Sequence, residues 1–171
     1  MSNTSMKKTG RNLKSCKTYS RKSVEKVIGA YSRFVPREII TLIGKDDINS
    51  VSLGDHVEKT MTILFSDIRD FTSLSEEMTP KENFTFINSY MESMNPVIVR
   101  NGGIIDKYIG DAIMALFPSS ADDAVRCAIE MLHQLHAHNK KIKESGYLPV
   151  KIGLGLNTGL MMLGIIGGEH F

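Results

Sequence analysis

Residues 107–117, KYIGDAIMALF, place an aspartate between two short apolar runs. The hydrophobic residues on both sides predict two strands, with Gly110 and Asp111 as the turn that joins them. A carboxylate among such neighbours is costly to desolvate unless a cation meets it. The stretch therefore predicts a β-hairpin with Asp111 at its tip. The role expected of Asp111 there is binding to a positive group rather than packing in the core.

A second apolar run, TMTILFSDI (60–68), predicts a buried strand that ends near Asp67. The polar turn after it is rich in residues that begin helices, and backbone N–H groups at such a turn can bind an anion. Asp67 alone could merely cap a helix. The chain between Asp67 and Asp111 has room for a crossover helix and a returning strand, so both acids are expected at one end of adjacent strands. Two aspartates brought together repel each other unless a divalent cation neutralises them, so the pair predicts a metal site.

Two long helices are expected around these strands. TPKE (79–82) has the pattern of a capping box, and Asn101–Gly102 is a typical helix end. Ser120 is the expected start of the second helix. The apolar stripes expected to face the core are Phe84, Ile87, Met91, Met94 and Ile98 in the first helix, and Val125, Ile129, Leu132 and Leu135 in the second.

Further elements complete the expected fold. Residues 36–47 predict a helix, and Val51 with Leu53 predicts a short strand. VKIGLGLNTG (150–159) and LMMLGIIGG (160–168) predict two separate strands. The resulting order, β-α-β-β-α-β, is typical of an α+β fold with a ferredoxin-like or palm-like sheet and helices packed on one face.

The chain has 171 residues, 42% of them hydrophobic, as expected for one globular domain with a core. Residues 1–26 contain eight basic residues and one acidic residue, whereas the remainder contains 13 basic and 18 acidic ones. We interpret residues 1–23 as a basic disordered tail or linker rather than a nucleic-acid-binding or lipid-binding arm, and residues 24–50 as a helical lead-in. No apolar run is long enough to cross a bilayer, and the two cysteines lack disulfide or metal spacing. A cytoplasmic location is therefore expected.

Three motifs resemble the class III nucleotidyl cyclases, which make cyclic AMP or cyclic GMP. They are FVPREIITLIGKDDINSVSLGDHVEKTMTILFSDIRDFTSLSE (34–76), GGIIDKYIGDAIMALF (102–117) and GLNTGLMMLGIIG (155–167). Any one of them alone would be a weak signal, whereas all three in this order are specific. The resemblance implies a lyase of signal transduction with its catalytic domain over residues 51–171.

The resemblance also implies roles for particular residues. Asp67 and Asp111 would be catalytic and, with the carbonyl of Ile68, would hold two Mg²⁺ or Mn²⁺ ions. Lys107 would reach the purine ring across the interface of a homodimer. Because guanylate-specific relatives usually carry glutamate at that position, the expected substrate is ATP rather than GTP. The groups implied to contact the triphosphate belong to Ile68, Arg69, Phe71, Thr72 and Gly110.

The resemblance stops short of the whole family pattern. Residues 51–171 are expected to lack the C-terminal strand and helix that carry the purine-selecting and transition-state residues. An inactive fragment, or a non-catalytic nucleotide-binding and dimerising module, is therefore the alternative. GGEHF (167–171) is similar to the signature of diguanylate cyclases, but IGDA (109–112) already fills the hairpin, so we interpret that match as accidental. We interpret His133, His136 and His138 as a solvated helix face rather than a metal cluster.

Overall fold

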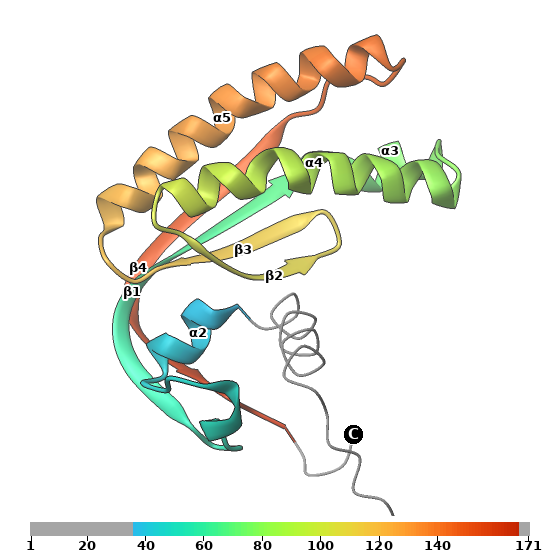
Figure 1. Ribbon diagram of the computed structural model, residues 1–171. Coiled ribbons are helices and arrows are strands. Elements are labelled where there is room, and N and C mark those ends of the chain that lie inside the picture. The colour runs from blue at the N-terminus through green and yellow to red at the C-terminus, as the bar shows by residue number, and fades with distance from the viewer. Residues whose placement is uncertain (1–35, 168–171) are drawn as a thin grey trace, which may run out of the picture. The chain divides into compact units, whose positions relative to one another are not determined.

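A four-stranded antiparallel sheet organises the computed structural model, which describes residues 36–167 (Figure 1). The strands lie in the order β2-β3-β1-β4. Their bounds are His56–Ile68 for β1, Ile104–Ile109 for β2, Ala112–Phe117 for β3 and Ile152–Gly164 for β4. The two long helices, α4 (Pro80–Arg100) and α5 (Ala121–Glu144), pack on one face of the sheet. The predicted α+β class and β-α-β-β-α-β order are confirmed.

The main core lies between this face of the sheet and the two long helices. Leu64 of β1, Ile113 of β3 and Met131 of α5 are all completely buried in it. Tyr90 of α4 is buried to the same extent, and its hydroxyl lies 3.0 Å from the Ser66 hydroxyl of β1. This buried hydrogen bond fixes α4 against the strand that ends in Asp67.

Helix α4 begins with the predicted capping box and ends where expected. The Thr79 hydroxyl accepts a hydrogen bond from the Glu82 N–H, and the Glu82 carboxylate accepts one from the Thr79 N–H. Asn101 is the C-terminal cap, and Gly102 follows it with φ of 76°. The predicted stripe was wrong at Phe84, whose side chain is 72% exposed. The side chains that α4 buries are Phe86, Tyr90, Met91, Met94, Val97 and Ile98.

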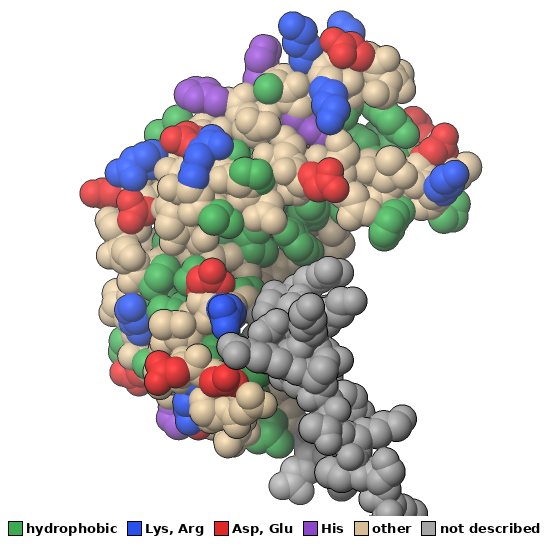
Figure 2. Space-filling model, in the orientation of Figure 1, with side chains coloured by type: hydrophobic (Ala, Val, Ile, Leu, Met, Phe, Trp, Pro, Cys, Tyr) green, Lys and Arg blue, Asp and Glu red, His purple; other side chains and the backbone are tan. Residues whose placement is uncertain are grey.

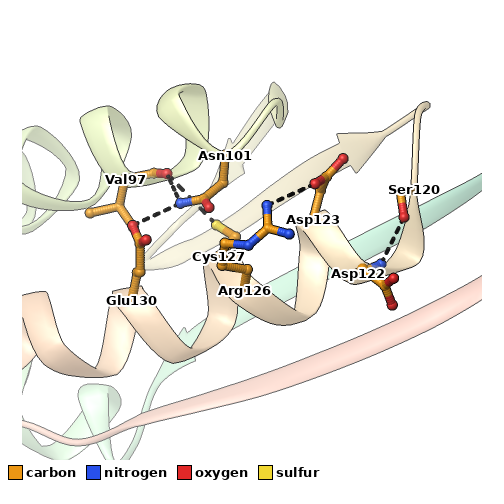
Figure 3. Close-up of polar contacts among 8 residues, drawn as sticks. All are labelled: Val97, Asn101, Ser120, Asp122, Asp123, Arg126, Cys127 and Glu130. Atoms are coloured by element: carbon orange, nitrogen blue, oxygen red, sulfur yellow. Dashed lines mark hydrogen bonds and ion pairs between the residues drawn. The ribbon is translucent and has the colours of Figure 1, made fainter.

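Helix α5 begins at the predicted cap, where the Ser120 hydroxyl accepts a hydrogen bond from the Asp122 N–H (Figure 3). Most of its predicted core stripe was wrong. Val125, Ile129 and Leu132 are about half exposed, with exposed fractions of 47%, 52% and 49%. The helix is rotated so that another stripe faces the sheet, made of Ala124, Cys127, Met131, Leu135, His138 and Ile142.

Polar contacts tie the C-terminal end of α4 to α5 (Figure 3). The Asn101 side-chain amide donates hydrogen bonds of 2.9 Å to both the Val97 carbonyl and the Glu130 carboxylate. Arg100 forms an ion pair of 2.8 Å with the same carboxylate. These contacts hold the start of the β2–β3 hairpin in place, because β2 follows directly after Asn101, Gly102 and Gly103.

Two predictions about strands were wrong. The two strands expected over 150–159 and 160–168 form the single strand β4, which pairs with β1 without interruption from Ile68–Ile152 to His56–Gly164. Because β4 pairs with β1 along its whole length, it stays extended even at its glycines. Val51 and Leu53 do not form a strand: Val51 caps the end of a 3₁₀ helix, and Leu53 lies in the turn that precedes β1.

A short helix covers part of the opposite face of the sheet. The helix expected over 36–47 is shorter, α2 (Arg37–Leu42), and a 3₁₀ turn follows at Ile48–Ser50. Ile39 and Ile43 pack there against Leu116 of β3. The tail and the lead-in expected before residue 36, and most of GGEHF, lie outside the described residues. Within residues 36–167, no helix is both long and apolar enough to cross a membrane.

Candidate metal and nucleotide site

The structure brings Asp67 and Asp111 together at one end of the sheet. Asp67 is exposed near the end of β1, and Asp111 lies in the two-residue turn between β2 and β3. The hairpin reaches β1 through β3, whose Ile113 is the register partner of Ser66. The Asp111 carboxylate accepts a hydrogen bond of 3.1 Å from the Ile68 N–H, so the tip of the hairpin is attached to the end of β1.

The electrostatics of this pair favour a cation. Partial burial raises the pKa of the Asp111 carboxyl above its usual value. A hydrogen bond with the Asp67 side chain raises this pKa further, and so does the negative charge of Asp67. Backbone N–H groups of Ile68 and of Asp111 itself lower it in part. Two carboxyls in contact need either a shared proton or a positive ion between them. The pair therefore fits a hard divalent cation, for which carboxylate oxygens are preferred ligands.

In the part of the chain that the structure describes, Asp67 and Asp111 do not belong to a larger cluster of metal-binding side chains. Among residues 36–167, no group of three or more His, Cys, Asp or Glu side chains could hold a metal ion. A cation at Asp67 and Asp111 would thus complete its coordination with backbone, water or ligand oxygens. Phosphate oxygens of a nucleotide are suitable ligands of this kind.

The turn after β1 presents backbone N–H groups next to the pair. Asp70 has a left-handed conformation, with φ of 58°, and its side chain does not cap the short helix α3 (Phe71–Glu76) that follows. The first N–H groups of a helix have no acceptor inside the helix. Phe71 and Thr72, the expected triphosphate contacts, occupy these first two positions. Gly110, another expected contact, has φ of 62° in the hairpin turn, a conformation suited to glycine.

Arg69 extends over the neighbouring strand β4. Its guanidinium group lies against Gly153, the register partner of Asp67. It also lines a shallow hollow of about 320 Å³ beside α3, together with Asp70, Glu77 and Lys151. The side chain is exposed, and among the described residues no carboxylate forms an ion pair with it.

Lys107 lies on the edge strand β2, on the same face of the sheet as Asp67. Lys107 is the register partner of Met114, and Met114 is the partner of Phe65, which precedes Asp67 by two positions on β1. Register partners and residues two apart share a face of a sheet. The exposed Lys107 ammonium forms an ion pair of 3.1 Å with Asp106, beside a break in the β2–β3 register.

The interpretation of the histidines was wrong for one of them. His133 and His136 are exposed, and basic and histidine side chains gather over α5 in Figure 2. His138, in contrast, is 3% exposed and meets the Tyr90 ring edge-on. Burial lowers its pKa, and its Nε2 atom has no hydrogen-bond partner. Burial likewise raises the pKa of Tyr90 to about 12.

Sequence reasoning missed the buried polar group formed by Ser66, Tyr90 and His138. Ser66 is a polar residue inside a predicted apolar strand, directly before Asp67. That position was the signal in the sequence that Ser66 belongs to a buried polar group. His138 follows Met131 and Leu135 at helical spacing, so it belongs to the same buried stripe of α5. The sequence-based prediction placed the other apolar stripe of this helix in the core, and the burial of His138 was therefore missed. Through Ser66, the group is attached to the core side of the strand that carries Asp67.

A family model, the adenylate and guanylate cyclase catalytic domain, matches residues 55–171. Two curated relatives are similar over most of this chain. The terminal-differentiation specific adenylate cyclase of Dictyostelium discoideum is 42% identical over 87% of this chain and 7% of its own length. The adenylate cyclase of Anabaena cylindrica is 39% identical over 84% of this chain and 30% of its own length. The chain therefore spans less than a third of either relative.

Solved structures share the fold. The crystal structure of the guanylyl cyclase Cya2 is 40% identical, with a TM-score of 0.62, over 67% of this chain and 61% of that chain. The similarity includes both adenylate-forming and guanylate-forming enzymes, so it supports the reaction more firmly than the choice of purine.

Proposed function

This chain belongs to the adenylate and guanylate cyclase catalytic domain family, and we propose that it converts ATP into cyclic AMP and pyrophosphate. The observation that carries the proposal is the hydrogen bond from the Ile68 N–H to the Asp111 carboxylate, which holds Asp111 at the end of β1 beside Asp67. The names of the Dictyostelium and Anabaena relatives support ATP as the substrate. The proposed role is the production of a cyclic nucleotide signal in the cytoplasm, where ATP is abundant.

Members of this family generally use divalent metal ions. We propose that Asp67, Asp111 and the carbonyl oxygen of Ile68 hold two Mg²⁺ or Mn²⁺ ions. Bound there, the ions would lower the pKa of the ribose 3′-hydroxyl and neutralise charge on the triphosphate. The closeness of the two carboxyls supports this role, because a divalent cation held there would neutralise the negative charge of both.

The chain's own groups would orient the triphosphate for an in-line reaction. Backbone N–H groups at Phe71 and Thr72 point out of the start of α3 and can donate to phosphate oxygens. Ile68, Arg69 and Gly110 complete the proposed contacts. The ribose 3′-hydroxyl loses its proton to water as a bond forms between its oxygen and the α-phosphorus. The bond from that phosphorus to the bridging oxygen breaks, and pyrophosphate leaves.

Lys107 is the proposed contact to the purine, supplied to the site of a second copy in a homodimer. Its position on an edge strand leaves the ammonium group exposed, as a contact across an interface requires. Adenine offers ring nitrogen acceptors to such a donor. Release of Lys107 from its ion pair with Asp106 would accompany base binding.

Two other functions follow from particular observations. GTP is the alternative substrate, because Cya2, a guanylyl cyclase, is 40% identical to this chain. A nucleotide-binding module without turnover is the second alternative, because the proposed Arg69 and backbone contacts can bind a triphosphate without completing the reaction.

The test is turnover by the purified full chain with Mn²⁺ and either ATP or GTP, followed by mass spectrometry of cyclic nucleotide and by a pyrophosphate assay. Equal formation of cyclic AMP and pyrophosphate is the expected result. Asp67→Asn should abolish both, whereas Asp122→Asn, which changes an exposed acid on α5, should leave both unchanged. Cyclic GMP as the main product would reverse the assignment of the purine. Tight Mn²⁺–ATP binding with no product would favour the module.

A further inference from the structure

We infer that Gly153 positions the Arg69 guanidinium as a polyphosphate contact on the β4 side of Asp67, an inference that rests on the proposed cyclase function. Gly153 lies on β4, outside the loop and the hairpin that hold the other site residues. Gly153 has no side chain that could contact a ligand, so it acts through the Arg69 guanidinium group that lies against it.

The guanidinium group occupies the space that a side chain at position 153 would need. A Cβ atom added to Gly153 would lie 2.7 Å from Cζ, 2.7 Å from Nη2 and 2.9 Å from Nε of Arg69. These three distances are nearly equal, so the plane of the guanidinium lies across the glycine. Cβ atoms are not found so close to other heavy atoms, and an alanine here would therefore displace the end of Arg69.

The location of this group is set by the strand register. Gly153 is the partner of Asp67 on β4, and residues that are partners in a sheet place their side chains on the same face. Asp111 approaches from the other side, through the β2–β3 hairpin. Asp67 therefore has a second carboxyl on one flank and a guanidinium group on the other.

The N–H groups of Arg69 are available to a ligand. Within the described part of the chain, Arg69 forms no ion pair, although the acids Asp70 and Glu77 line the hollow beside it. A guanidinium group donates two parallel hydrogen bonds to phosphate oxygens, and it remains charged at all relevant pH values. Negative charge increases on pyrophosphate as its bond to the α-phosphorus breaks, and a donor already in place stabilises that charge.

The strand provides a matched control for this idea. Gly155 lies two positions further along β4, on the same face of the sheet, and a Cβ atom added there would meet nothing within 4 Å. Gly153→Ala and Gly155→Ala thus make the same chemical change in the same strand. They differ in whether the added methyl group meets Arg69.

The experiment compares these variants in the full chain with Mn²⁺ and ATP. Gly153→Ala should lower kcat/KM by about tenfold or more and weaken inhibition by pyrophosphate, while Gly155→Ala stays within about twofold of the wild type. Arg69→Ala should lower kcat by roughly 100-fold, the order of loss typical for one donor to a developing charge. In the Arg69→Ala background, adding Gly153→Ala should cause no further loss, because its target is gone.

Thermal unfolding midpoints of the two glycine variants show whether both are folded, and inhibition by tripolyphosphate measures the binding of phosphate alone. The inference is overturned if the wild type is active and Gly153→Ala behaves like Gly155→Ala. It is also overturned if Gly153→Ala lowers activity equally with and without Arg69. A wild type that makes no cyclic nucleotide would contradict the proposed function instead, and the tripolyphosphate affinities of the variants would then decide the role of Gly153.

Discussion

The backbone N–H of Ile68 donates a hydrogen bond of 3.1 Å to the carboxylate of Asp111, 43 residues later in the chain. The donor belongs to the residue after Asp67, so the contact fixes the separation of the two acids through the backbone. Backbone contacts of this kind hold a site more rigidly than contacts between flexible side chains alone. The hairpin tip and the end of β1 therefore act as one unit.

Removing one carboxyl should abolish metal binding without unfolding the domain. Asp111→Asn keeps an oxygen that can accept the Ile68 N–H, but it loses the charge that a divalent cation needs. We expect Mn²⁺ to raise the thermal unfolding midpoint of the wild type and to leave that of Asp111→Asn unchanged. Turnover should fall by at least about 100-fold. A variant that retained both responses would contradict the proposed metal site.

The raised pKa of Asp111 predicts how pH acts on the metal-free protein. Because the folded state holds this proton more tightly than the unfolded state, Asp111 makes the fold less stable as pH rises through its folded pKa. Urea unfolding in EDTA between pH 4 and pH 7 measures the effect. Compared with the wild type, Asp111→Asn should gain stability toward neutral pH. Mn²⁺ affinity should fall as the pH is lowered, since protons compete for the same oxygens.

Reversing the charge of Lys107 should change the preference for the purine. A glutamate at this position accepts hydrogen bonds, which suits the N–H groups of guanine and not the ring nitrogens of adenine. Lys107→Glu should lower the ratio of kcat/KM for ATP over GTP by roughly tenfold or more. Lys140→Glu, a similar reversal on the exposed surface of α5, is the control. An unchanged ratio would contradict the role of Lys107 at the base.

The buried pair of Ser66 and Tyr90 should be energetically coupled. Tyr90→Phe leaves the Ser66 hydroxyl buried without its partner, at a cost of about 1–3 kcal/mol in the free energy of unfolding. Ser66→Ala should have a comparable cost. The double variant should lose less than the sum of the two, and urea unfolding of all four proteins measures the difference. Strict additivity would show that the hydrogen bond contributes nothing.

His138 should make the fold sensitive to acid. Burial lowers its pKa from the ordinary 6.5, so the unfolded chain takes up a proton before the folded protein does. Stability should therefore fall as the pH is lowered through that range. His138→Gln should reduce this loss between pH 7 and pH 5.5, measured by the urea midpoint, whereas His136→Gln on the exposed surface should not. Equal losses in all three proteins would contradict the assignment.

Local patterns predicted much of the fold correctly because their physical causes are local. The capping box at Thr79 and Glu82, the cap at Ser120 and the Gly110–Asp111 turn depend on residues that are close in the chain. The two acids could also be placed at neighbouring strand ends, since one crossover helix separates their strands. Their predicted association was confirmed, while the roles assigned to them remain proposals.

The errors arose where burial depended on distant parts of the chain. Helix α5 has two apolar stripes of similar spacing, and the sheet covers the one with Cys127 and Met131 rather than the one with Val125 and Ile129. Nothing in the local pattern distinguishes them. The position of His138 follows from that choice, which is why its burial was not predicted.

The sequence by itself determined the order of strands and helices, their caps and turns, and the presence of an acid at two strand ends, because these follow from residue spacing and backbone preference. Only the tertiary structure decided that β4 is one uninterrupted strand, because the length of a strand depends on its partner β1. It also decided that Arg69 lies over Gly153 beside Asp67, because strand register brings these residues together across more than 80 positions of the chain. Such contacts are set by packing of the whole sheet, which no short stretch of sequence contains.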